Sequence, residues 1–162
     1  MLFGIEISAE MHERRHILVY GVAPEFVLEH PCVFDLTQKE LYSLVKSVNG
    51  VVIQAHPYRK GGKLLDPAYL DGVEINCHPL YGTSDSERVI ETANTYGLTL
   101  TCGGDYHTDT YRCTCGMYLP DSITDGVALG RYIADAKQVK LRVHEPYGSI
   151  YDMEYTRRTV SR

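Results

Sequence analysis

The chain has 162 residues, a length that fits one domain, and 44% of them are hydrophobic, which is enough for a buried core. Its formal net charge of −5 and its lack of a basic block argue against a general nucleic-acid binder, whose affinity depends on clustered Lys and Arg. No apolar run approaches the roughly 20 residues that cross a bilayer, and the N-terminal sequence does not resemble a secretory signal. We therefore expect a protein that binds neither nucleic acid nor membrane.

Apolar runs alternate with helical patterns along the chain. In chain order the patterns predict strands over 2–7 and 16–22, a helix over 37–50, strands over 51–55 and 72–77, a helix over 84–97, a strand over 98–102, a helix over 123–136 and a last strand over 138–143. This alternation with short connections predicts a parallel α/β sheet. Residues 1–143 are expected to form the domain. The tail, 144–162, has no clear period and is interpreted as a docked extension or a loose segment.

Two of the predicted helices carry recognisable end signals. Thr37 and Glu40 have the spacing of a capping box, and so do Ser84 and Glu87 at the start of the second helix. Gly97 is a typical residue just past a helix end. These signals predict where both helices begin and where the second one ends.

Polar side chains stand at the ends of the predicted strands, where active sites gather in α/β folds. Asp105 and His107 lie in the stretch "GGDYHTD", two residues apart, so an extended chain would point both side chains the same way. The other candidates are Glu6 inside the first strand, His16 at the start of the second, and His56 and His78 after the next two.

This set of residue types indicates a site for two or more divalent cations. Carboxylates bridge hard cations, and neutral imidazoles suit zinc, iron or manganese. Glu6 is flanked by Ile5 and Ile7, and burying its carboxylate there without a cation would cost several kcal/mol. A metal centre therefore explains the set better than unrelated hydrogen-bonding roles.

The motifs "GIEIS", "HILVYG", "VVIQAHPYR", "GVEINC" and "GGDYHTD", in this order, resemble the polymerase and histidinol phosphatase (PHP) superfamily of metal-dependent phosphoesterases. The resemblance covers roughly residues 2 to 143. It implies a distorted parallel-strand β/α barrel with its site at the carboxyl ends of the strands. It also implies an incomplete barrel here, because the family's opening His-x-His strand is missing. Either the chain is a shortened relative or its start was assigned too late, and the upstream genomic DNA would separate the two.

The resemblance also implies roles for individual residues. Glu6 resembles the bridging carboxylate, with His16 and His56 as its partners on one metal. Asp105 resembles a ligand of a second metal, and His107 a ligand of a third. The expected cofactors are divalent zinc, manganese or iron ions. Because the first-strand histidines are absent, we expect weak turnover or none.

The remaining histidines are weaker candidates. His12 lies four residues before His16 and would be an added ligand, although its surroundings read as a polar connection. His30 precedes a proline in a predicted loop. His78 is interpreted as either a structural residue or an additional ligand or substrate contact. His144, near the tail, is expected to be inert.

The leading functional hypothesis is hydrolysis of a small phosphorylated substrate by metal-activated water. Asp105 and Arg59 are the expected catalytic residues: Arg59 would hold a phosphate oxygen, or else form only a surface salt bridge. Tyr58 and Tyr106 would line the pocket. The alternative is a degenerate, non-catalytic metal-binding domain that acts as a sensor or interaction module.

The five cysteines support a third hypothesis. Their odd number and irregular spacing predict reduced thiols and a cytoplasmic location. Cys113 and Cys115, spaced C-x-C, leave open a zinc module, which would lose metal on Cys substitution and not on His substitution. A second clear ligand pair is missing, since Cys32, Cys77 and Cys102 are scattered.

The first strand favours self-association. A strand at the open edge of an incomplete barrel has unpaired N–H and C=O groups beside apolar Leu2, Phe3 and Ile5. Two copies that meet at this edge would form a two-fold homodimer. The alternative is that the tail, 144–162, folds back and covers the edge.

Overall fold

The computed structural model describes residues 2–8, 15–109 and 114–160. The strands are β1 (Gly4–Ser8), β2 (His16–Tyr20), β3 (Val51–Gln54), β4 (Gly72–Asn76), β5 (Thr99–Gly103), β6 (Gly116–Tyr118), β7 (Gln138–His144) and β8 (Ile150–Thr156). The α-helices are α1 (Glu25–Glu29), α2 (Gln38–Ser47), α3 (Ser86–Tyr96) and α4 (Gly126–Asp135), and short 3₁₀ helices cover Val33–Asp35, Arg59–Gly61, Pro67–Tyr69 and Pro79–Tyr81. His12 and Cys113 lie outside the described residues.

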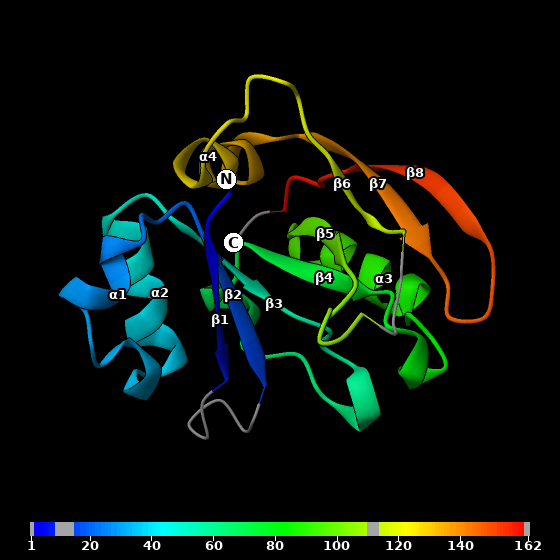
Figure 1. Cartoon of the computed structure of the whole chain (residues 1–162), viewed down its shortest axis with the longest axis horizontal. Helices are drawn as coiled ribbons and strands as arrows, with labels where there is room; N and C mark the ends of the chain where they lie inside the picture. The colour runs from blue at the N-terminus through cyan, green and yellow to red at the C-terminus, as the bar shows by residue number, and fades with distance from the viewer. Residues whose placement is uncertain (1, 9–14, 110–113, 161–162) are drawn as a thin grey trace.

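The strands form two sheets (Figure 1). The first has five strands in the order β1-β2-β3-β4-β5, and the second has three in the order β6-β7-β8. Parallel pairing is confined to β3, β4 and β5. β1 and β2 pair antiparallel with each other, β2 pairs antiparallel with β3, and the second sheet is antiparallel throughout.

The predicted parallel β/α barrel is therefore wrong, because within the described residues β1 and β5 remain the two edges of an open mixed sheet. Only residues 9–15 connect β1 to β2, and a parallel pair needs a crossover of a dozen or more residues. The predicted last strand of the parallel sheet, β7, pairs instead with β6 and β8. Strand alternation along the sequence cannot reveal that choice of partner.

Helices cover both faces of the five-stranded sheet. Buried residues of α2 and α3, such as Leu41 and Val89, share one core with Val73 of β4. Ile133 of α4 packs in a second core with Ile53 of β3. Successive strand residues point to opposite faces, so a run of apolar residues in the central strands is buried by both layers of helices.

The helix-end predictions have two outcomes. The capping box of Thr37 and Glu40 is confirmed at the start of α2, and Gly97 ends α3 with a φ of 63°. The box of Ser84 and Glu87 is wrong: α3 begins after Asp85, whose side chain makes no capping hydrogen bond. The Ser84 hydroxyl instead accepts from the amide of Ser86, the first residue of α3, at 3.1 Å and donates to the carboxylate of Glu145 at 2.5 Å.

The tail forms part of the second sheet. β8 lies along the whole of β7, and the hydroxyl of Tyr155 donates to the carbonyl of Leu98 at 3.0 Å. The tail therefore packs at the β5 side of the molecule and does not cover β1 (Figure 1). Among the described residues, every helix is too short or too polar to cross a bilayer.

Candidate metal site at the strand ends

The predicted site residues gather at one end of the five-stranded sheet, where its parallel strands stop. β3, β4 and β5 are parallel and end there, and antiparallel β2 begins there. Ser8 pairs with His16 at this end of the sheet, and the Ala55 amide donates to the His16 carbonyl at 3.0 Å. Segments from five strands thus meet, although β2 runs in the opposite direction from the prediction.

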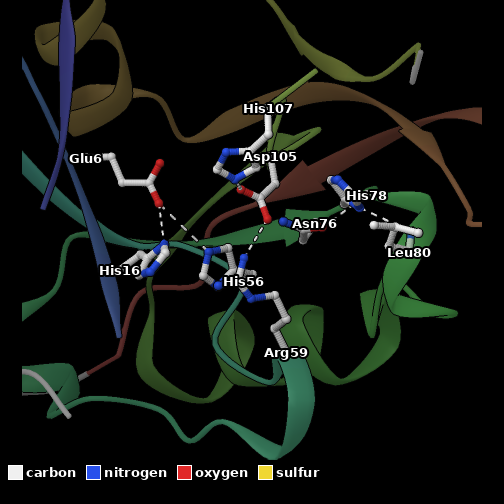
Figure 2. A network of polar contacts seen from close by, with 9 residues as sticks. All are labelled: Glu6, His16, His56, Arg59, Asn76, His78, Leu80, Asp105 and His107. Carbon is white, nitrogen blue, oxygen red and sulfur yellow. Dashed lines mark hydrogen bonds and ion pairs between the residues drawn. The ribbon is translucent and has the colours of Figure 1, made fainter. Parts of the chain in front are cut away.

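Glu6, His16 and His56 form a compact group of possible metal ligands (Figure 2). One ligand atom from each lies within 4.8 Å of the other two. Nδ1 of His16 is 2.5 Å from Oε1 of Glu6, and Nε2 of His56 is 4.0 Å from the same oxygen. Around a tetrahedral zinc ion with bonds of about 2.0 Å, ligand atoms lie about 3.3 Å apart. Small side-chain shifts from the 2.5 Å and 4.0 Å separations would therefore let the group hold one ion.

His56 offers the clearest sign of a missing partner in this group. Its Nε2 atom is buried and has no hydrogen-bond partner, which is uncommon for a buried polar atom. Burial and the nearby Arg59 cation lower the pKa of His56 to about 4. The imidazole is therefore neutral at pH 7, the form that binds a metal.

Asp105 and His107 lie beside this group and form a separate cluster. The Asp105 side chain is only 3% exposed, and its Oδ1 is 2.9 Å from Nε2 of His107. Its other oxygen, Oδ2, accepts from Nη1 of Arg59 at 2.6 Å. Burial opposes ionisation of Asp105, but the Arg59 cation and the neighbouring His56 and His107 outweigh it and lower its pKa. Both carboxylate oxygens thus have protein partners.

Arg59 has features of both roles that the sequence left as alternatives. It forms the salt bridge with Asp105, and it also lines a cleft. Tyr58 and Lys60 line the same cleft together with His56. The cleft therefore presents two cationic side chains next to the candidate metal ligands.

Tyr106 does not contribute to the pocket. It is 65% exposed, and its hydroxyl bonds to Asp109. His30 ends α1, where its ring packs against Phe26. Nδ1 of His144 accepts from the Thr114 amide at 3.1 Å. These side chains thus have local structural contacts.

The sequence reasoning missed two polar residues of β4. Glu74 is buried between Glu6 and Asp105, and the His56 amide donates to its carboxyl group. Burial, and then the charges of Glu6 and Asp105, raise the pKa of Glu74 to about 8. A Cβ at Gly103 would lie 2.2 Å from Oε1 of Glu74, so the glycine makes room for this carboxyl.

Asn76, the other missed residue, ends β4 and lines the cleft. Its Nδ2 atom is buried without a hydrogen-bond partner. Its Oδ1 accepts from the amide of His78, whose own Nδ1 accepts from the Leu80 amide at 3.1 Å (Figure 2). His78 therefore shapes the turn, whereas Asn76 directs a donor to the cleft. Its place near the end of the strand predicted over 72–77 was the available signal.

We predict that Glu74→Gln makes the stability of the metal-free protein less dependent on pH. The pKa of Glu74 is raised by folding, so its contribution is fully present below the ordinary value of 4.5 and is lost as the pH rises to about 8. Between these two pH values, Glu74→Gln should reduce the fall in the free energy of unfolding by about 1.4 kcal/mol per pH unit.

Urea unfolding with a chelator present, at several pH values in this window, measures the effect. Glu91→Gln, an exposed change on α3, is the matched control. Equal slopes for Glu74→Gln and the original protein would contradict the prediction.

The fold and the site together define a mixed α/β protein with a His–carboxylate group at the end of the sheet where the parallel strands stop. No protein-family model matches the chain, and no curated protein matches it. The crystal structure of PsfC from Pseudomonas syringae PB-5123 is similar, with a TM-score of 0.60 and 20% sequence identity. The match covers 82% of this chain and 55% of PsfC, so the chain spans about half of that protein's length. At this identity the similarity concerns the fold alone.

Proposed function

We propose that the chain is a metal-dependent phosphoesterase related to the PHP superfamily, with a small phosphorylated substrate. The observation that carries the proposal is the group of Glu6, His16 and His56, in which a buried imidazole nitrogen has no partner. The proposal rests on the site residues and their order along the chain. It does not include a closed barrel.

The group fits a zinc, manganese or iron ion in number and type of ligand atoms. Such an ion supplies Lewis acidity and lowers the pKa of a bound water. Arg59 and Lys60 line the cleft next to it, and the planar guanidinium of Arg59 matches two phosphate oxygens. Asp105 holds Arg59 in place, and Asn76 has a donor for a further substrate oxygen.

The test is hydrolysis of an aryl phosphate ester with added Mn²⁺, Zn²⁺ or Fe²⁺. We expect weak turnover that a chelator abolishes, because these 162 residues contain no His-x-His motif and small misplacements of reacting groups cost large rate factors. Turnover that persists in the chelator would contradict the proposal.

One observation favours the second candidate function, a non-catalytic metal-binding domain that acts as a sensor or interaction module. Both oxygens of Asp105 are engaged by Arg59 and His107. Among the described residues, the one His–carboxylate group with three ligand atoms in reach is then Glu6, His16 and His56. Stoichiometric metal binding with no turnover under any of the three metals would favour this function.

We also propose that two chains associate through β1. In the described residues β1 has a strand neighbour on one side, β2, and the tail that was the alternative cover lies in the other sheet. An edge strand of this kind can pair with another chain, and the two-fold arrangement satisfies both edges. Size-exclusion chromatography with light scattering should give twice the chain mass of 18.3 kDa. A monomer at micromolar concentration would refute the dimer.

A further inference from the structure

A second cluster of possible ligands lies away from the strand-end group and consists of three cysteines. Cys77 follows β4, Cys102 belongs to β5 and Cys115 precedes β6. Their sulfur atoms all lie within 4.8 Å of one another, and those of Cys77 and Cys102 are 3.4 Å apart. The cluster thus joins two segments of the five-stranded sheet to the first strand of the three-stranded sheet.

The size of the cluster fits a tetrahedral zinc ion. Zinc–sulfur bonds of about 2.3 Å place sulfur atoms about 3.8 Å apart around such an ion. The 3.4 Å separation of Cys77 and Cys102 is slightly shorter than this value and all three pairs lie within 4.8 Å, so small side-chain rotations bring three sulfurs to one centre. Soft thiolate ligands favour zinc over magnesium, calcium or manganese.

Two of the sulfurs already have backbone contacts with the second sheet. The backbone amide of His144 donates to Sγ of Cys77 at 3.4 Å, the kind of outer hydrogen bond that orients and tunes metal ligands. The Cys102 thiol donates to the carbonyl of Arg142 at 3.3 Å. Both of these partners belong to β7, so the second sheet already contacts the sulfurs.

An entry path is also present. Cys77 and Cys102 are buried, but Cys115 is partly exposed and lines a surface cleft with Thr114, Met117 and others. Buried cysteines often serve as small apolar residues. Three that converge from separate segments, with an amide donor at the sulfur of Cys77 and an opening to solvent at Cys115, fit a ligand set better.

We propose that Cys77, Cys102 and Cys115 bind one zinc ion through their thiolates, and that this ion fastens the three-stranded sheet to the five-stranded sheet. Three S–H groups lose their protons to solvent as three zinc–sulfur bonds form, and no electrons are transferred. The site is independent of the proposed phosphoesterase function. It differs from the module predicted on Cys113 and Cys115, because two of its ligands come from β4 and β5.

Cobalt substitution tests the proposal. Metal-free, reduced His56→Ala protein, which lacks a ligand of the strand-end group, is titrated with Co²⁺. We expect one equivalent to produce an intense near-ultraviolet thiolate-to-cobalt charge-transfer band, which Zn²⁺ then abolishes. The absence of this band would overturn the proposal, and that result does not depend on a cysteine variant folding.

Cysteine variants locate the ligands in the same background. Cys102→Ser and Cys115→Ser should each lose the band, and zinc should no longer raise their melting temperature. Cys32→Ser, an exposed cysteine outside the cluster, is the matched control and should keep both. A band that survives Cys102→Ser would show that the metal does not need Cys102 and would overturn the proposal.

Thiol counting excludes a redox explanation. The chain has five cysteines, and denatured zinc-loaded protein should give five reactive thiols without prior reduction. Two fewer thiols, with a Cys77–Cys102 disulfide in the peptide map, would overturn the metal site in favour of an oxidised pair.

Discussion

Replacing His56 with alanine should release the metal from the Glu6, His16 and His56 group. The substitution removes one of three ligand atoms, and the one whose nitrogen is buried without another partner. Loss of a hydrogen-bonding residue around a metal site typically lowers affinity about 10- to 100-fold, and loss of a direct ligand should lower it further. Elemental analysis after dialysis, together with calorimetric titration, measures the change.

The experiment is best done in a Cys115→Ser background, so that metal held by the cysteine cluster does not mask the loss. His30→Ala is the matched control, since His30 lies at the end of α1 and contacts Phe26. Equal metal content in His56→Ala and the parent protein would remove His56 from the site. It would leave the cysteine proposal untouched.

Replacing Asp105 with alanine should lower kcat/KM for an aryl phosphate ester by at least about 100-fold, the cost typical of a misplaced reacting group. The substitution removes the 2.6 Å contact that fixes Arg59 at the cleft and the contact to His107. Initial rates with saturating Mn²⁺ give the measurement.

Asp109→Ala is the matched control, because Asp109 lies in the same loop but is exposed and bonds to Tyr106. It should retain the parent rate. If Asp105→Ala retains it as well, Asp105 is not catalytic. If the parent turnover is robust and Asp105→Ala abolishes it, a His-x-His motif matters less for turnover than we expect.

The sequence determined the local features of this protein. The Thr37–Glu40 capping box and the Gly97 helix end depend on residues within one turn, so their spacing alone predicts them. The alternation of strands and helices likewise located most elements. It also located the polar residues at strand ends, because the change from apolar to polar residues that marks a strand end is visible in the sequence whichever strands lie beside it.

Strand partners could not be predicted in this way. The same apolar run serves equally well in a parallel or an antiparallel pair, and only packing decides which strand lies beside it. β7 therefore pairs with β6 and β8 and does not belong to the sheet in which it was predicted. For the same reason the hydrogen bond from the Ser84 hydroxyl to Glu145 could not be predicted from the sequence.

The tertiary structure alone decided which chemical groups meet. Cys77, Cys102 and Cys115 are scattered in sequence, and they converge because β4 and β5 pair in parallel and β6 packs beside β5. Glu74 looks like an ordinary strand residue until burial and the charges of Glu6 and Asp105 raise its pKa. Burial and charge proximity are sums over all neighbours, so they exist only once the chain has folded.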